Sequence, residues 1–249
     1  NHWIQSEKID VSPYQKINVK KENFIRDVDR LIEEGYYGLN VTVPLKEDAY
    51  KYCDNTSDVA RALKAVNTLI VNKDGVYGDN TDPIGFEKSI ANKGLNNKLC
   101  LVLGAGGSAR AVVYALTHMK CEIGIYNRTR ENAESLCSDL GVEAKILTET
   151  TLREFVGSSQ LVVNTTSLGQ QEGEENNLID FDSLNSSAHV YDLIYNPSKT
   201  TFLRHAEKNG CTVQNGLEML IHQAAQSFNL WHDTMPEIDE DLMSVLGVN

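Results

Sequence analysis

Lys46 stands two residues beyond a proline, at the end of a segment in which polar and apolar residues alternate. A lysine in a dry cleft beside a carboxylate can exchange a proton near neutral pH, because burial and neighbouring charge shift its proton affinity. Asp82 is a carboxylate that could orient it, and Asn67 is an amide that could bind the hydroxyl groups of a polyol. Each residue also has an ordinary structural interpretation, as a solvated lysine, a helix N-cap or a turn residue.

A glycine-rich turn forms a second candidate site. Gly104, Gly106 and Ala109 have the spacing G-x-G-x-x-A, directly after an apolar run and at the start of an amphipathic one. Gly104 permits a tight turn, Gly106 lets a pyrophosphate approach the backbone, and the helix N-terminus offers amide donors with partial positive charge. A bare glycine turn would also be compatible with a structural role, but its place between a strand and a helix predicts a dinucleotide site.

The end of the next predicted strand indicates which dinucleotide binds. Proteins that bind NAD usually have an acidic residue there, about 20 residues beyond the glycines. The segment 126–130 instead reads Tyr-Asn-Arg-Thr-Arg. A carboxylate would repel a 2′-phosphate, whereas Arg128 can bind one through charge-assisted hydrogen bonds. We expect NADP, the alternative being that Arg128 is a solvated surface residue. Hydride transfer would require a substrate hydroxyl to lose or gain a proton, a role that suits Lys46.

Short β-branched runs alternate with amphipathic stretches, which predicts an α/β fold with a largely parallel sheet. A βαβ series of the doubly wound type begins near Pro83, and the chain from Gly216 predicts two helices that return to the first domain. The expected strands are 14–19, 37–43, 65–71, 75–78, 98–103, 121–126, 161–164 and 189–193. The expected helices before residue 216 are 22–34, 57–63, 108–119 and 130–140.

Composition excludes several classes of function. The 249 residues include 23 Lys and Arg against 35 Asp and Glu, a net charge of -12, which disfavours a nucleic-acid-binding surface. No apolar run approaches the roughly 20 residues that span a bilayer. The five cysteines are isolated, which favours buried thiols in a reducing cytoplasm over a disulfide framework or a zinc site. No metal site is expected.

Eight motifs, in order along nearly the whole chain, resemble those of shikimate dehydrogenases. They are Asn40-Val-Thr-Val-Pro-Leu-Lys46, Ala65-Val-Asn-Thr68, Gly78-Asp-Asn-Thr-Asp82, Gly104-Ala-Gly-Gly107, Asn127-Arg-Thr129, Asn164-Thr-Thr-Ser167, Tyr191-Asp-Leu-Ile-Tyr-Asn-Pro197 and Asn215-Gly-Leu-Glu-Met-Leu220. The resemblance implies reversible, NADPH-dependent reduction of 3-dehydroshikimate to shikimate in the cytoplasmic aromatic pathway. It also implies a substrate and catalytic domain formed by 1–82 with 216–249, and a Rossmann-type NADP-binding domain formed by 83–215.

The resemblance assigns roles to individual residues. Lys46 falls on the family's proton donor and acceptor, and Asp82 on its carboxylate partner. The residues that fall on substrate-binding positions are Thr42, Asn67, Asp82, Tyr195 and Gln223. Those that fall on cofactor-binding positions are Asp58, Gly104, Ala105, Gly106, Gly107, Ser108, Asn127, Arg128, Thr129, Arg130, Glu131, Asn132, Leu193 and Gly216.

The sequence departs from the family pattern in three places. Pro83 stands where glycine is usual, which stiffens the seam between the domains, and Glu218 replaces a residue that is often small or apolar. The family's opening strand and Ser-x-Ser loop, which bind the substrate carboxylate, have no counterpart here. We expect about 20 residues to be absent, and the first sheet to expose unpaired backbone or to be completed by another chain.

Two alternatives remain open at this level. The first is a quinate/shikimate dehydrogenase, which accepts quinate and often uses NAD. Arg128 argues against NAD as the cofactor, but the sequence does not exclude quinate as a substrate. A non-catalytic NADP sensor would have the same fold, but it would have no use for both Lys46 and Asp82. The expected partners are a small-molecule substrate and, for assembly, a second copy in a homodimer; neither nucleic acid nor membrane is expected.

Overall fold

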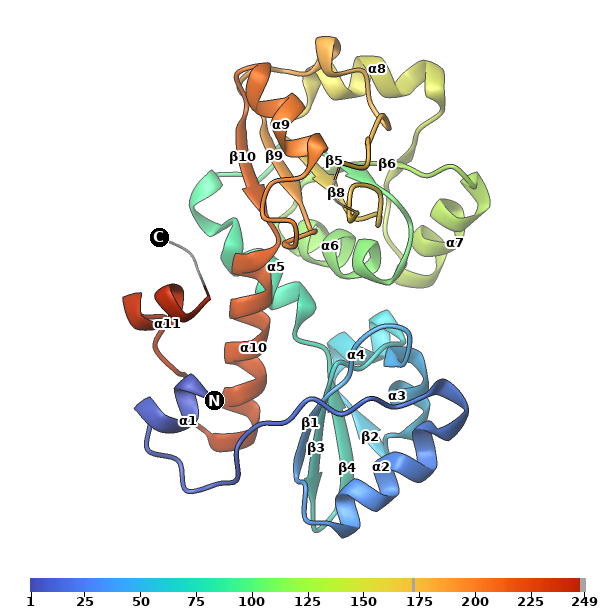
Figure 1. Ribbon diagram of the computed structural model, residues 1–249. Coiled ribbons are helices and arrows are strands. Elements are labelled where there is room, and N and C mark those ends of the chain that lie inside the picture. Colours follow the sequence, from blue (N-terminus) through green and yellow to red (C-terminus); the bar gives the residue numbers. More distant parts are fainter. Residues whose placement is uncertain (172, 247–249) are drawn as a thin grey trace. The chain divides into compact units, whose positions relative to one another are not determined.

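The computed structural model describes residues 1–171 and 173–246, which form two compact units. The first unit consists of Asn1–Thr81 together with the chain from Gln223 onward, and the second is Asp82–His222 (Figure 1). Within the described residues, no helix has the length and apolar character needed to cross a bilayer.

The first unit is built on a four-stranded sheet in the order β1-β3-β4-β2. Its strands are β1 (Gly38–Asn40), β2 (Asn55–Thr56), β3 (Thr68–Asn72) and β4 (Gly75–Asp79). The Asp74-Gly75 turn closes the predicted hairpin, with Asn72 opposite Gly75 and a positive φ at Gly75. β1 is antiparallel to β3, and β2 is parallel to β4.

Helices cover both faces of this sheet (Figure 1). Phe24 and Val28 of α2 (Phe24–Glu33) pack with α3 (Lys46–Tyr52), α4 (Asp58–Leu63) and the buried side of β3. On the other side, Trp231 of α10 (Leu217–His232) donates from Nε1 to the Leu69 carbonyl over 3.0 Å. The short helices α1 (His2–Ser6) and α11 (Glu240–Val245) lie beside this part of α10, where the ring centroids of Trp3 and Phe228 are 5.8 Å apart. The predicted return of the C-terminal helices to the first domain is confirmed.

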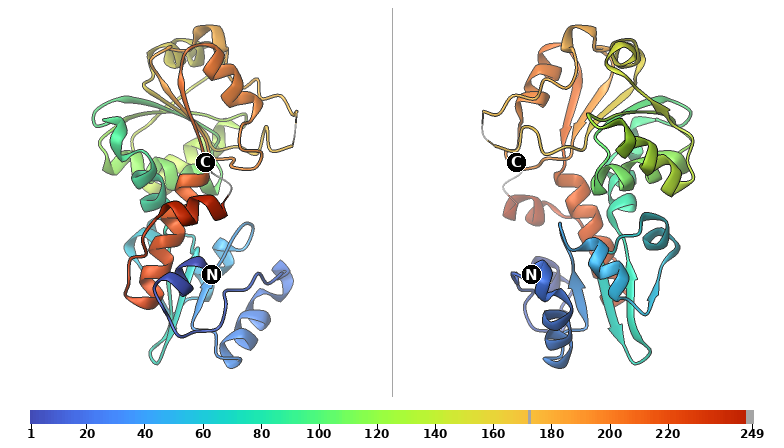
Figure 2. Two further views of the ribbon diagram at one scale, coloured as in Figure 1. Left: turned by 60° about the vertical axis from the view of Figure 1, so that its left-hand side comes forward. Right: turned by 90° about the vertical axis from the view of Figure 1, so that its right-hand side faces the viewer.

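The second unit is a doubly wound parallel sheet of six strands, in the order β10-β9-β8-β5-β6-β7. Its strands are β5 (Leu99–Leu103), β6 (Glu122–Tyr126), β7 (Lys145–Ile146), β8 (Leu161–Asn164), β9 (His189–Asp192) and β10 (Thr212–Asn215). One face packs against α5 (Asp82–Ser89), α6 (Gly107–His118) and α7 (Arg130–Leu140), and the other against α8 (Glu149–Ser158) and α9 (Thr201–Lys208). Figure 2 shows the same layers from two further directions. The strands β5 and β8 are buried on both faces, which explains their continuous apolar runs.

Three short 3₁₀-helices complete the described elements: Lys21–Asn23, Ala91–Lys93 and Phe181–Ser183. The α/β fold with a Rossmann-type second domain, predicted from the alternation of strands and helices, is confirmed. The sequence pattern did not reveal α3, α5, α8, α9, β2, β7 or β10, because most of these elements are short or lie in segments without a clear apolar period.

The strand predicted for residues 14–19 is wrong. The segment is extended, but no backbone hydrogen bond joins residues 15–19 to any other described part of the chain. A strand requires a pairing partner, which local β-propensity cannot supply. The strand predicted for 37–43 is also shorter, since only Gly38–Asn40 pairs in a ladder and the chain then enters a turn in which Leu45 N–H donates to the Thr42 carbonyl over 2.9 Å.

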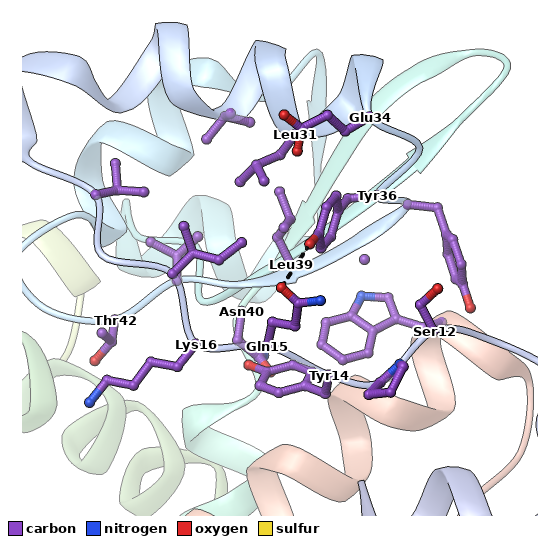
Figure 3. Close-up of a pocket in the computed structure, with 18 of the residues that line it drawn as sticks. Ser12, Tyr14, Gln15, Lys16, Leu31, Glu34, Tyr36, Leu39, Asn40 and Thr42 are labelled. Atoms are coloured by element: carbon purple, nitrogen blue, oxygen red, sulfur yellow. Dashed lines mark hydrogen bonds between the residues drawn. The ribbon is translucent and has the colours of Figure 1, made fainter.

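An open groove of about 1590 Å³ separates the extended segment from β1. Apolar side chains of α2, including Phe24, Val28 and Leu31, line its interior. Side chains rather than backbone groups connect its two sides: Tyr14 Oη donates to Asn40 Oδ1 over 3.1 Å, and Tyr36 Oη donates to Gln15 Oε1 over 3.3 Å (Figure 3). We call this feature the β1 groove.

Candidate active site

Lys46 is the first residue of α3, directly after the turn that follows β1. Two backbone hydrogen bonds hold this turn beside the start of β3: Val41 N–H donates to the Asn67 carbonyl over 2.8 Å, and Val66 N–H donates to the Lys46 carbonyl over 2.9 Å. Thr42 lies in the same turn and is exposed. The sequence motifs that contain Lys46 and Asn67 are therefore neighbours in the fold.

The structure brings Asn67 and Gln223 together, although 156 residues separate them in sequence. Asn67 Nδ2 donates to Gln223 Oε1 over 3.2 Å, and the Asn67 side chain is almost fully buried. Gln223 lies on the part of α10 that packs on the first unit. Two residues predicted to contact substrate thus form one amide pair.

The other predicted substrate and catalytic residues lie at element ends. Asp82 is the first residue of α5, followed by Pro83, which is well tolerated in the first turn of a helix. Tyr195 follows β9 in the second unit and is about half exposed (49%). Asp58 opens α4 in the first unit and pairs with Arg61, with 2.7 Å between Oδ1 and Nη1.

The glycine turn joins β5 to α6, as the fingerprint predicts. Gly104 has φ +109°, and a Cβ at this position would lie 2.6 Å from Thr165 Oγ1. A Cβ on Gly106 or Gly107 would meet nothing within 4 Å, so open space lies in front of the helix. The N-terminus of α6 has neither a side-chain cap nor an acidic residue in its first turn. Its amide donors and partial positive charge fit a pyrophosphate that contacts the loop from Gly104 through Ala105 to Ser108.

The segment after β6 fits a ribose that carries a phosphate. Asn127 Nδ2 donates to the Thr129 carbonyl over 2.7 Å and so shapes the turn into α7, while Arg128 is exposed. Arg130 pairs with Glu134 along α7, with 2.7 Å between Nε and Oε1, and Glu131 and Asn132 share the first turn of this helix. Of the two arginines in this segment, Arg130 is thus engaged by Glu134. Arg128 is exposed at the end of β6, where it could bind a phosphate.

Leu193 and Gly216, both predicted to contact cofactor, meet at the carboxyl ends of β9 and β10. A Cβ on Gly216 would lie 2.0 Å from the Leu193 carbonyl oxygen, so only glycine fits there. Gly216 N–H donates to the Ile194 carbonyl over 3.3 Å. This close approach places the two residues at the edge of the sheet where ligands bind in doubly wound folds.

A buried carboxyl group that was not predicted from the sequence lies at the same edge. Asp192 Oδ1 accepts from Asn164 Nδ2 over 3.0 Å, and its Oδ2 accepts from Thr200 Oγ1 over 2.6 Å. Burial raises the pKa of Asp192 to about 6, against the opposing effect of these hydrogen bonds. Asn164 Oδ1 in turn accepts from Thr166 N–H and so orders the loop beside Gly104. A polar residue at the end of an apolar strand was the available signal.

A doubly wound sheet with an open glycine turn, next in sequence to an α/β unit that carries a lysine and buried amides, defines a nicotinamide-dinucleotide-dependent oxidoreductase. Three family profiles match the chain: the shikimate dehydrogenase substrate binding domain over residues 1–69, shikimate / quinate 5-dehydrogenase over 87–193, and the shikimate 5'-dehydrogenase C-terminal domain over 216–246.

Individual relatives agree with these profiles. A shikimate dehydrogenase (NADP(+)) of Caldicellulosiruptor bescii is 38% identical over 220 residues, which cover 86% of this chain and 76% of that protein. The enzyme of the same name from Roseobacter denitrificans is 38% identical over an alignment of 253 positions, which covers 99% of this chain and 91% of that enzyme. The crystal structure of shikimate 5-dehydrogenase from Thermus thermophilus in complex with NADP(H) and shikimate is 31% identical, with a TM-score of 0.84, and covers 94% of this chain and 87% of its own. The chain belongs to the shikimate dehydrogenase family, which confirms the resemblance inferred from the eight motifs.

Proposed function

We propose that this protein catalyses the reversible, NADPH-dependent reduction of 3-dehydroshikimate to shikimate, a step of aromatic amino acid biosynthesis. The observation that carries the proposal is the open turn at Gly106 and Gly107 together with Arg128 in place of an acid, within a chain of the shikimate dehydrogenase family. These features support NADP as the cofactor, and a dinucleotide of this kind supplies a hydride when bound.

Lys46 is the proposed proton donor and acceptor of the reaction. As the ketone is reduced, Lys46 Nζ gives a proton to the new hydroxyl oxygen, and in the reverse direction it accepts that proton, with Asp82 as its carboxylate partner. Thr42, Asn67, Tyr195 and Gln223, with Asp82, would hold the hydroxyl and carboxylate groups of the substrate. The pairing of Asn67 with Gln223 supports a polar, hydroxyl-binding surface in the first unit.

Different segments of the chain would bind different parts of the cofactor. The loop 104–108 would bind the pyrophosphate and the segment 127–132 the phosphorylated ribose, while Leu193, Gly216 and Asp58 are the remaining proposed contacts. We propose 1–82 with 216–249 as the substrate and catalytic domain and 83–215 as the NADP-binding domain. A cytoplasmic location and a homodimer complete the proposal, and sedimentation of the purified chain tests the latter.

The β1 groove is the proposed place of the family's opening strand with its Ser-x-Ser loop. Unpaired backbone at residues 15–19 on one side and the free edge of β1 on the other support this assignment. A chain that carries such a strand should have a lower KM for shikimate than the chain of residues 1–249, with the same KM for NADPH. Equal shikimate KM values would refute it.

The decisive experiment measures loss of NADPH absorbance with 3-dehydroshikimate, in parallel with oxidation of shikimate and of quinate by NADP and with NADH in place of NADPH. Turnover with 3-dehydroshikimate and preference for NADPH are expected. Faster turnover of quinate than of shikimate would favour a quinate dehydrogenase, the other activity in the matching profile's name. NADPH binding without turnover of any of these substrates would instead indicate a sensor.

A further inference from the structure

A buried polar cluster lies behind two of the proposed substrate residues. It joins β1, the start of β3, the residue pair after β4 and α10, all within the first unit. Its members are Asn40, Asn67, Thr68, Thr81, Gln223 and Ser227. We call it the Ser227 cluster, since Ser227 contacts most of the others.

Ser227 has no exposed surface, and its hydroxyl is surrounded by polar atoms. Its Oγ lies 2.8 Å from Thr68 Oγ1, 3.2 Å from Thr81 Oγ1 and 3.0 Å from Asn40 Nδ2. It also lies 3.0 Å from the carbonyl of Gln223, one turn earlier on the same helix. That last contact, in which the serine hydroxyl donates, is common for a serine in a helix, whereas the other three connect Ser227 to β1, to β3 and to the residue before α5.

The orientation of the Asn67 amide follows from a backbone group. Thr81 N–H, which can only donate, lies 2.9 Å from one terminal atom of Asn67, so this atom is Oδ1. Asn67 Nδ2 therefore faces Gln223, and the Gln223 atom 3.2 Å away must be the acceptor Oε1. One amide orientation determines the other, and the amide nitrogen of Gln223 lies on the opposite side of its side chain.

Ser227 holds this arrangement through Thr68. Thr68 Oγ1 lies 2.8 Å from Asn67 Oδ1, to which it donates, and 2.8 Å from Ser227 Oγ, so it connects the serine to the amide. The Ser227 hydroxyl donates to the Gln223 carbonyl over 3.0 Å and so links the same group to α10. Asn40 Nδ2 donates to Ser227 in turn. Asn40, Ser227, Thr68 and Asn67 thus form one connected hydrogen-bond network, and networks of this kind strengthen each bond in a buried environment.

We propose that Ser227 is a positioning residue for the substrate: through Thr68 it fixes the amides of Asn67 and Gln223 so that Gln223 presents its amide nitrogen to an oxygen of the substrate. The proposal rests on the proposed function, which assigns Asn67 and Gln223 to substrate binding. Ser227 itself touches neither substrate nor cofactor in this scheme. Its loss should therefore affect the affinity for the polyol substrate and leave cofactor binding unchanged.

The test compares Ser227→Ala with the unmodified chain. Ser227→Ala removes the hydroxyl that contacts Thr68 and accepts from Asn40, and it leaves each of these groups short of one hydrogen-bond partner. We expect the KM for 3-dehydroshikimate to rise about tenfold, because Thr68 loses the partner that holds it against Asn67 Oδ1 and the amide pair is then positioned less firmly. The KM for NADPH should stay within about twofold of the unmodified value.

Two further variants separate positioning from general destabilisation. Ser159→Ala removes another fully buried serine hydroxyl, which donates to the Phe155 carbonyl, and should leave both KM values unchanged. Ser227→Cys keeps a weak donor of similar shape and should recover part of the substrate affinity, and it replaces Ser227→Ala if that variant fails to fold.

The outcomes distinguish the two proposals. An unmodified chain without turnover of 3-dehydroshikimate would overturn the proposed function. An active unmodified chain combined with an unchanged substrate KM in Ser227→Ala, or with equal rises in both KM values, would overturn the role of Ser227 and leave the proposed function standing.

Discussion

Asn164 Nδ2 lies 3.0 Å from Asp192 Oδ1, so a buried amide and a buried carboxyl group join the carboxyl ends of β8 and β9. Thr200 Oγ1 completes the site at 2.6 Å from Asp192 Oδ2. Asn164 Oδ1 also accepts from Thr166 N–H, so these bonds order the loop beside Gly104. The glycine turn therefore lies beside a group whose charge changes within the accessible pH range.

Asp192→Asn should flatten the pH dependence of folding stability. Burial raises the pKa of Asp192 from 3.8 to about 6. Below pH 3.8 the carboxyl group is protonated in both states, and as the pH rises to about 6 the unfolded chain loses the proton first, so the folded state loses stability. The full loss is about 3 kcal/mol. The asparagine retains an acceptor for Asn164 and a donor for Thr200.

Urea unfolding between pH 4 and pH 8 checks this prediction, with the exposed hairpin residue Asp74, changed to Asn, as control. The unmodified chain and Asp74→Asn should lose stability together as the pH rises, and Asp192→Asn should lose less. Parallel curves for all three proteins would contradict the buried-carboxyl interpretation.

Lys46→Ala should abolish most of the turnover and leave NADPH binding intact. Loss of a general acid typically lowers kcat by about 10²- to 10⁴-fold, and Lys46 is the proposed proton donor. Lys51→Ala, which removes an exposed lysine from the last turn of the same helix, is the matched control. Steady-state kinetics and NADPH fluorescence titration measure the two effects; unchanged turnover in Lys46→Ala would refute its role.

Arg128→Ala should reduce discrimination between the two nicotinamide cofactors. Charge-assisted bonds to the 2′-phosphate are available only to NADPH, so its KM should rise about 10- to 100-fold while that for NADH stays constant. Arg153→Ala, at an exposed guanidinium that pairs with Asp180 on another part of the unit, should change neither. If the KM values for NADH and NADPH rise equally, Arg128 does not bind the 2′-phosphate.

Gly216→Ala should destabilise the second unit and weaken NADPH binding together. The added methyl group would lie 2.0 Å from the Leu193 carbonyl oxygen, a contact that backbone atoms cannot relieve without moving β9 or β10. The expected cost is about 3 kcal/mol or more. Gly141→Ala, which meets nothing within 4 Å and only keeps a positive φ, should cost about 1–2 kcal/mol and leave NADPH affinity unchanged. Thermal unfolding with and without NADPH compares the two, and equal shifts would count against the close contact.

The amides of Gly38 and Asn40 should exchange with solvent faster than those of the inner strands. Val41 N–H and the Tyr37 carbonyl bond to β3, so alternation turns the N–H groups of Gly38 and Asn40 toward the β1 groove. Hydrogen exchange followed by NMR tests this, with Leu69 in the paired strand β3 as reference. Protection at Gly38 equal to that at Leu69 would show that the edge is covered.

Sequence reasoning worked best where structure is local. The apolar run 161–164 and the amphipathic segment 130–140 match β8 and α7 residue for residue, and the glycine turn lies where its spacing requires. It failed at 14–19, because β-propensity cannot show whether a partner strand is present.

The residues of the candidate site that lie in recognisable sequence motifs could be predicted, and the others could not. Asn67 was predicted from its residue type and position and Gln223 from the resemblance, whereas Ser227, on the same helix as Gln223, has no signal in a helix that is rich in small and polar residues. Its proposed role depends on contacts with β1 and β3, which are distant in sequence. Asp192 was quoted within a motif, but its burial became visible only in the fold.

The open edge of β1 also governs how copies of this chain behave toward one another. Proteins usually protect edge strands with lysine, proline or a bulge, whereas Gly38-Leu39-Asn40 carries neither charge nor proline. Such an edge is a template for strand addition between molecules, and the net charge of -12 opposes their approach only at low ionic strength. Concentrated, salt-rich solutions of this chain should therefore aggregate through β1, while dilute, low-salt solutions should keep it dispersed.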